Sequence, residues 1–193
     1  QTHNCKLEQV GPATRVAVNL SGVSHGELRR GDVLTTVGWL SPTFAIDVRL
    51  RIIPDAPRAV RHNMFVTVHT GAAEALARLR LLDKDTVSPG ESVWAQLKFD
   101  HPMVVVKGDH FVIRSSQRTL GGGIVVDADG RRHRRMHSPV LDRLSIMERG
   151  SAKEVILSAI TSSEPTGFDQ LTRTTNFSES EMKIVLEEMV SHF

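Results

Sequence analysis

Apolar and polar residues alternate over much of the chain between residues 44 and 126. The clearest alternation covers residues 44–53, where one face carries Ile46, Val48, Leu50 and Ile52. A period of two is typical of a strand with one buried face. Further segments of this kind lie at 64–70, 92–99, 111–114 and 124–126, with turn residues between them. The pattern predicts a mainly β protein, built as an antiparallel β-barrel or a sandwich.

Two further regions extend this prediction. Residues 15–20 alternate in the same way, and another strand is expected to start at Val33. Residues 74–82 are rich in Ala, Leu and Arg, which favours a helix by propensity. However, strands flank this segment on both sides, and one of its faces carries Ala75, Ala77, Leu79 and Leu81. We therefore predict a strand here as well.

The spacing of apolar residues changes to three and four after Met147. Residues 152–160 carry Val155, Ile156, Ala159 and Ile160 at helical spacing, and residues 166–174 can form a second short helix. Ser178 and Glu181 make a capping box for a third helix, whose apolar residues recur at three and four: Met182, Val185, Leu186, Met189 and Val190. Three short helices predict a small winged-helix-like segment, the start of a helix-turn-helix domain.

A glycine triplet at 121–123 lies in the second strand of a predicted hairpin over residues 108–126. A phosphate-binding P-loop is excluded, because no Lys follows the glycines and no helix starts there. We interpret the triplet as a place where another backbone comes close. A bulge in a barrel strand fits the spacing equally well.

Arginines follow this hairpin in a tight cluster, Arg131, Arg132, Arg134 and Arg135. Together with Arg114 and Arg118 they are candidate RNA phosphate contacts. The alternative is a solubilising basic linker between domains. The net charge of the chain, only +2, does not decide between these two interpretations. Tyr is absent and both Trp lie elsewhere, so any RNA is expected to be recognised through its backbone or shape.

Sequence signals for catalysis and metal binding are weak. His133 and His137 are four residues apart on a segment without a helical pattern, so we expect surface histidines. No zinc-ligand spacing and no Gly-x-Ser-x-Gly elbow occurs. The single Cys5 excludes an intrachain disulfide and fits the cytoplasm. No signal peptide or transmembrane run is visible. We expect no catalytic residue, metal or cofactor in this chain.

Several motifs carry a family resemblance. Residues 10–23 and 28–34 resemble the closing strands of domain II in translational GTPases of the elongation factor Tu type, and residues 108–126 resemble the end of domain III. Asn19-Leu20, His69-Thr70-Gly71 and the Gly-Gly-Gly-x-Val-x-Asp ending at Asp127 look specifically like the selenocysteine-specific elongation factors. The helical tail agrees, because that family carries winged-helix repeats after domain III.

The resemblance implies four regions. Residues 1–37 would be the C-terminal part of the domain II β-barrel, 38–128 a β-barrel of domain III type, 129–150 a basic linker and 151–193 the start of the winged-helix domain. The GTPase motifs are missing and the first residue is Gln1, so we expect a non-catalytic fragment. GTP and Mg²⁺ would bind in the missing domain of a GTPase parent.

The resemblance also implies residue roles and partners. Arg15 would line the aminoacyl pocket beside the selenol, and the tRNA-binding residues would be Arg114, Ser115, Ser116, Gln117 and Arg118. The implied partners are selenocysteinyl-tRNA, the ribosome at recoded UGA codons, and the selenocysteine insertion hairpin of the mRNA through later winged-helix repeats of the parent. No membrane partner is expected.

Two alternatives and one assembly remain open. The chain could be a DNA-binding regulator with a β-barrel and a helix-turn-helix, although the third helix carries Glu179, Glu181, Glu187 and Glu188 against a single Lys183, which disfavours DNA phosphates. It could also be a plain structural barrel. A truncated domain II would expose strand edges, so we expect residues 1–36 to pack on the barrel or to form a domain-swapped dimer, which light scattering would detect.

Overall fold

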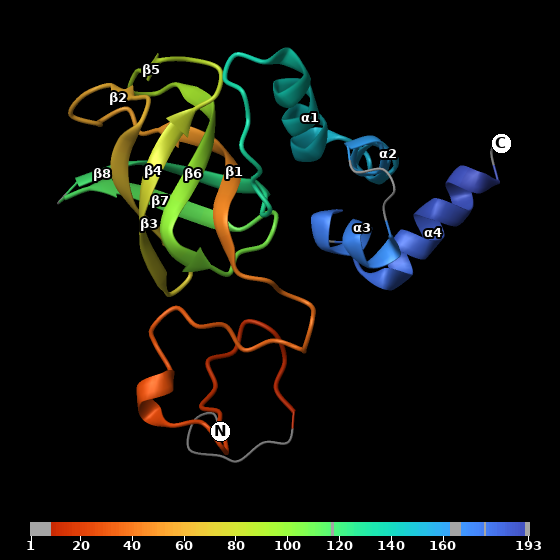
Figure 1. The fold of residues 1–193 in the computed structure, drawn as a ribbon. Coiled ribbons are helices and arrows are strands. Elements are labelled where there is room, and N and C mark those ends of the chain that lie inside the picture. Colours follow the sequence, from red (N-terminus) through yellow and green to blue (C-terminus); the bar gives the residue numbers. More distant parts are fainter. Residues whose placement is uncertain (1–8, 117, 163–166, 176, 192–193) are drawn as a thin grey trace. The chain divides into compact units, whose positions relative to one another are not determined.

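The computed structural model describes residues 9–116, 118–162, 167–175 and 177–191, and Figure 1 shows the fold. The chain divides into two compact units, residues 1–30 and residues 31–193. The second unit contains every strand and every α-helix among the described residues.

A closed antiparallel barrel forms the main part of the second unit. Its strands follow one another around the barrel in the order β1-β6-β4-β3-β7-β8. Their bounds are Thr43–Ile52 (β1), Met64–Thr70 (β3), Ala73–Leu81 (β4), Ser92–Met103 (β6), His110–Ser115 (β7) and Arg118–Asp127 (β8). Two short strands, β2 (Val60–Arg61) and β5 (Thr86–Val87), pair separately. The predicted antiparallel barrel is confirmed, and the sandwich alternative is excluded because β8 pairs with β1.

The barrel interior holds the faces that the alternation predicts. Ile46, Val48, Leu50 and Ile52 are fully buried, and so are the inward residues of β4 and β6. The strand predicted at 74–82 is confirmed, because β3 and β6 pair with β4 on its two sides. Pairing with β3 and β6 satisfies the backbone hydrogen bonds of β4 on both sides. This pairing outweighs the helix propensity of the side chains of β4.

Three consecutive glycines let β8 lie close to both of its neighbours. A Cβ on Gly123 would lie 1.8 Å from the carbonyl oxygen of Arg49, and one on Gly122 would lie 2.4 Å from that of Phe111. The predicted close approach of another backbone is therefore confirmed. The glycines are in continuous register with both β1 and β7. The bulge interpretation is wrong at these positions, and the irregularity lies instead between Ile113 and Arg114.

No strand occurs among residues 9–42, where the regular structure is the short 3-10 helix His25–Glu27. The strands predicted at 15–20 and from Val33 are therefore wrong for the described chain, and this stretch does not form part of a barrel. Alternation alone does not hold a strand, because its backbone groups need a partner strand. Val18 and Trp39 are correspondingly exposed, by 58% and 61%.

The described part of the chain after the barrel forms four α-helices: α1 (Ser138–Arg149), α2 (Ala152–Ser162), α3 (Phe168–Thr175) and α4 (Glu179–Val190). The last three confirm the predicted helices, including the capping box of Ser178 and Glu181. Ile156, Leu171 and Met182 form their shared core. Val190, the last residue of α4, is 74% exposed. No helix of the described chain is both long and apolar enough to cross a membrane.

Helix α1 lies within residues 129–150, the stretch expected to be a basic linker. Pro139 stands at its start, a position that tolerates the missing N–H of proline. Leu144 and Met147 pack against Leu82, Trp94 and Val126 on the outside of the barrel. This second apolar cluster holds α1 against the sheet.

Candidate nucleic-acid interface

The β7–β8 hairpin presents its polar residues at its tip. Ser115 pairs with Arg118 across the turn, and Arg114 lies between Thr119 and Thr67 of β3. Arg118 and Ser116 are exposed, whereas Arg114 and Ser115 are half-buried. Gln117, the fifth residue predicted here, lies outside the described residues. The structure thus brings together Arg114, Ser115, Ser116 and Arg118 at one edge of the barrel.

The register change next to the tip has a simple consequence. Ile113 pairs with Gly121 while Arg114 pairs with Thr119, so Leu120 is an extra residue in β8. Leu120 is buried in the barrel core, and Arg118 and Thr119 face solvent. Such an irregularity re-aims side chains at the end of a strand, and here it turns the basic tip outward.

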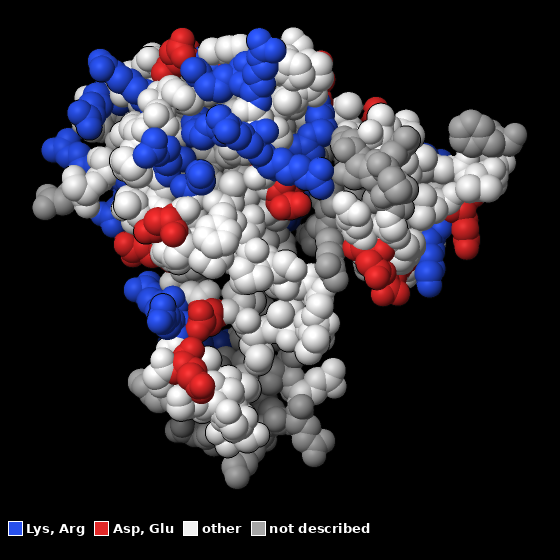
Figure 2. All heavy atoms as spheres, in the orientation of Figure 1, with Lys and Arg blue, Asp and Glu red and all other residues white. Residues whose placement is uncertain are grey.

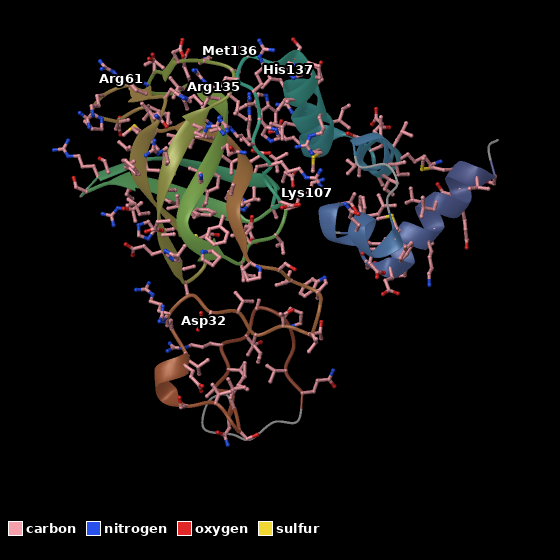
Figure 3. All side chains as sticks on the ribbon, viewed as in Figure 1. Asp32, Arg61, Lys107, Arg135, Met136 and His137 are labelled. Carbon is pink, nitrogen blue, oxygen red and sulfur yellow. The ribbon has the colours of Figure 1, made fainter. Side chains whose placement is uncertain are left out.

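The predicted arginine cluster belongs to a segment that crosses the barrel, residues 130–137, which we call the strap. The N–H of Gly130 donates to the carbonyl of Ala45 in β1 (2.9 Å), and the N–H of Met136 donates to the carbonyl of Leu82 after β4 (2.7 Å). Met136 has a φ of 52°, where the chain turns into α1. Figure 3 shows Arg135, Met136 and His137 together at this end of the strap.

Only part of the arginine cluster is available to a ligand. Arg131, Arg132 and Arg134 are exposed. Arg135 is used within the fold, since its Nε donates to the carbonyl of Leu81 (2.7 Å) and its Nη2 to that of Lys84 (2.8 Å). The same Nη2 contacts the carboxylate of Asp85 at 2.6 Å, and this bond lowers the pKa of Asp85.

The hairpin tip and the strap are two separate basic sites. Arg118 begins β8, and the strap follows the last residue of that strand, Asp127. Ten residues of extended strand separate the two ends of β8 by about 30 Å. A ligand that touches Arg118 therefore approaches a different end of the barrel from the one where the strap begins.

A buried polar cluster, unforeseen from the sequence, anchors the strap. His133 pairs with the carboxylate of Asp47, a residue of β1 that is fully buried. The amide of Gln96 donates to Asp47 (2.9 Å) and to the carbonyl of Arg131 (2.7 Å). The expectation of a surface histidine is therefore wrong for His133. The reason is that Asp47 needs a buried partner, because an unpaired buried carboxylate is costly.

Arg143 connects the same cluster to α1. Its Nη1 donates to Asp127 at 3.0 Å, and its Nη2 lies 3.7 Å from Asp47. Burial raises the pKa of Asp127, and the charge of Arg143 acts in the opposite direction. The arginine thus compensates for two carboxylates that the strap and α1 cover.

A sequence signal for α1 did exist. Val140, Leu141, Leu144 and Met147 recur at three and four, which is a helical spacing, but the adjoining arginines favoured a linker. No comparable local signal marks Asp47 and His133, which are 86 residues apart.

Replacing Arg135 by Ala should destabilise the fold, whereas replacing the neighbouring Arg134 should not. Arg135→Ala removes two hydrogen bonds to backbone carbonyls and should lower the free energy of unfolding by about 1–3 kcal/mol. Arg134→Ala should stay within about 0.5 kcal/mol. Urea denaturation of the two variants makes the comparison, and equal stability would mean that Arg135 is not a structural arginine.

Comparison with known proteins agrees with this architecture. The family model described as "Selenocysteine-specific elongation factor, beta-barrel domain" matches residues 47–132. A selenocysteine-specific elongation factor of Desulfomicrobium baculatum is 34% identical over 162 residues, which cover 83% of this chain and 25% of that protein. The chain thus spans a quarter of the length of this relative. The family match begins within β1 and extends through β8 into the strap. The barrel therefore belongs to the beta-barrel domain family of the selenocysteine-specific elongation factors.

Proposed function

We propose that this chain is the tRNA-binding portion of a selenocysteine-specific elongation factor that delivers selenocysteinyl-tRNA to the ribosome at recoded UGA codons. The observation that carries the proposal is the exposed basic tip of the β7–β8 hairpin on a barrel of this family. In this proposal the chain is itself non-catalytic and acts in the cytoplasm, and GTP is bound by another part of the factor.

The hairpin tip suits the backbone of a structured RNA. Arg114 and Arg118 supply positive charge, and the short side chains of Ser115 and Ser116 let a phosphate come close to the main chain. Paired strands on both sides of Arg114, in β3 and β8, hold it in place. Contacts of this kind position an RNA without reading its sequence.

Two further roles belong to the same proposal. Arg15 would favour the ionised selenol of the aminoacyl group in the complete factor, because a guanidinium stabilises a nearby anion. The helices α2 to α4 would begin the winged-helix arm that reaches the mRNA insertion hairpin. The alternative of a DNA-binding regulator is disfavoured, since α4 exposes Glu179, Glu181, Glu187 and Glu188.

Binding of aminoacylated tRNA tests the proposal. In the intact factor, selenocysteinyl-tRNA should bind more tightly than seryl-tRNA, and Arg15→Ala should reduce that preference. Arg118→Ala should weaken both complexes alike, by about fivefold to tenfold. The slope of the logarithm of the binding constant against the logarithm of the salt concentration should become shallower by about one, the value for one lost phosphate contact. Gel-shift titrations at several salt concentrations measure both effects. The proposal fails if the two tRNAs bind equally well to the unaltered factor.

A further inference from the structure

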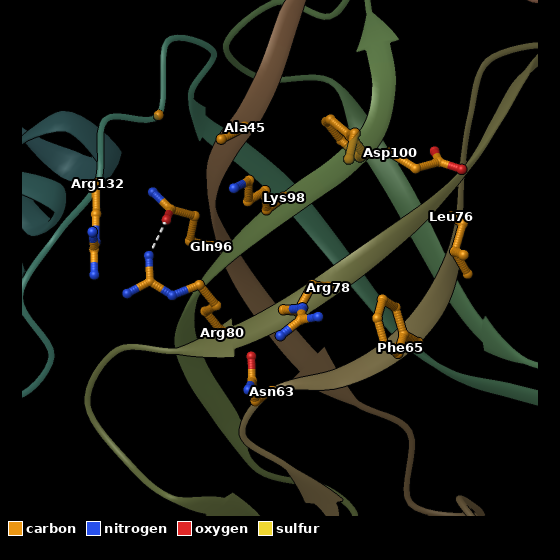
Figure 4. A pocket seen from close by; sticks show the side chains of 12 residues that line it. Ala45, Asn63, Phe65, Leu76, Arg78, Arg80, Gln96, Lys98, Asp100 and Arg132 are labelled. Carbon is orange, nitrogen blue, oxygen red and sulfur yellow. Dashed lines mark hydrogen bonds between the residues drawn. The ribbon is translucent and has the colours of Figure 1, made fainter.

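A groove of about 740 Å³ lies on the outer face of the barrel, and none of the hairpin-tip residues lines it. β3, β4, β6 and β1 form its floor, and Gly130 and Arg132 of the strap form one wall (Figure 4). Four cationic side chains line it against one carboxylate, that of Asp100: Arg78, Arg80, Lys98 and Arg132. Figure 2 shows how Lys and Arg crowd the barrel surface.

The strand register places an aromatic ring and two cations in one row across this groove. Phe65 of β3 is opposite Arg78 of β4, and Arg78 is opposite Lys98 of β6. Lys98 is in turn opposite Ala45 of β1, whose small side chain leaves room beside the strap. The row therefore runs from an aromatic end to an open, basic end.

Phe65 is the unusual member of this row, because it is 56% exposed. The guanidinium of Arg78 lies over its ring, 4.8 Å from the centroid. An exposed ring stacked with arginine is the kind of platform on which proteins hold an unpaired base. Leu76 continues the apolar side of the groove next to it.

The cations divide into one that is held by the fold and others that are exposed. Arg80 donates to the side-chain oxygen of Gln96 (2.6 Å) and to the carbonyl of His133 (3.2 Å), so it is fixed beside the strap. Lys98 and Arg132 are both exposed, and they line the groove on its strap side. A phosphate next to a base stacked on Phe65 would meet these two charges.

We propose that this groove binds an unpaired nucleotide of RNA, with the base on the Phe65–Arg78 pair and the adjoining phosphates on Lys98 and Arg132. The inference depends on the proposed function only in taking RNA as the partner. It adds a second contact surface, formed by other residues than those of the hairpin tip. An acidic protein segment would use the cations but has no need of the aromatic platform.

The test compares two RNA hairpins, one with a single unpaired nucleotide in its stem and one fully paired, with the full chain as the protein. The unaltered chain should prefer the hairpin with the unpaired nucleotide. Phe65→Leu should weaken that complex by about tenfold and abolish the preference. Lys98→Gln should weaken both complexes. It should also make the slope of the logarithm of the binding constant against the logarithm of the salt concentration shallower by about one. Arg61→Gln, which removes a charge outside the groove, should leave both unchanged.

Distinct outcomes would overturn the inference. If the Phe65→Leu variant still prefers the hairpin with the unpaired nucleotide to the same extent, no base stacks on the ring of Phe65. Competition by a polyglutamate peptide as strong as that by RNA would assign the groove to an acidic protein instead. If Arg118→Ala weakens tRNA binding while the groove variants have no effect, the proposed function stands and the groove inference fails. If the groove variants weaken RNA binding but the intact factor binds selenocysteinyl-tRNA and seryl-tRNA equally well, the groove inference stands and the proposed function fails.

Discussion

Gly123→Ala should open the barrel seam between β1 and β8 and lower the free energy of unfolding by about 3 kcal/mol or more. The new Cβ would lie 1.8 Å from the carbonyl oxygen of Arg49 and 2.9 Å from its carbonyl carbon. Both atoms belong to the backbone of a strand that is also paired with β6, so it cannot yield without breaking another ladder. Overpacking of side chains usually costs less, because side chains can change rotamer.

Thermal unfolding followed by circular dichroism measures this effect, and the expected fall in Tm is about 6–12 °C for a compact unit the size of residues 31–193. Gly26→Ala is the matched control, because a Cβ there meets nothing within 4 Å. It should leave the barrel transition unchanged. A Gly123→Ala variant with an unaltered Tm would show that β8 lies farther from β1 than the structure has it.

The barrel could be predicted from the sequence because its signals are local. The period of two in residues 44–53 reports a strand with one buried face, whatever its partners are. The strand at 74–82 required one step more, since its composition favours a helix and its neighbours decide the outcome. Residues 15–20 show the limit of the same signal, because alternation does not reveal whether a partner strand is present.

The candidate sites were harder to predict, because they depend on contacts between distant residues. The hairpin tip is a local feature, and the family resemblance pointed to its residues as candidates for tRNA binding. Asp47, by contrast, reads as an ordinary charged residue on the outer face of β1, and its burial becomes visible only with the strap in place. The groove row joins Phe65, Arg78 and Lys98 through the register of three strands, which the sequence does not specify.

Arg143→Ala should loosen α1 from the barrel, and its cost should depend on pH. The side chain of Arg143 is partly exposed, while the two carboxylates that it contacts, Asp127 and Asp47, are almost fully buried. Removing one partner from such a group leaves buried charge without compensation. We expect the free energy of unfolding at neutral pH to fall by about 2–4 kcal/mol, as measured by urea denaturation.

The sign of the pH dependence follows from Asp127, whose pKa is raised in the folded protein chiefly by burial. A carboxyl with a raised pKa stabilises the fold through its protonated form. That contribution is complete below the unfolded pKa of about 3.9 and is lost as the pH rises through the folded value. Without Arg143 the pKa of Asp127 should rise further, so the variant should differ little from the unaltered chain below about pH 4 and most at neutral pH. The charges of Asp47 and Lys107 also act on Asp127, and His133 pairs with Asp47. For this reason the stability of the variant is compared with that of the unaltered chain at each pH.

A double-mutant cycle with Asp127→Asn isolates the Arg143–Asp127 pair from these neighbours. Asparagine keeps an oxygen that can accept from the N–H of Asp129, which donates to Asp127 at 3.0 Å, but it carries no charge. In this background Arg143→Ala should cost less by about 1–3 kcal/mol at neutral pH, and the remaining cost should no longer change near pH 4. A cost that is equal in both backgrounds and at both pH values would assign the role of Arg143 to Asp47 or to packing, and the link between α1 and the end of β8 would not be electrostatic.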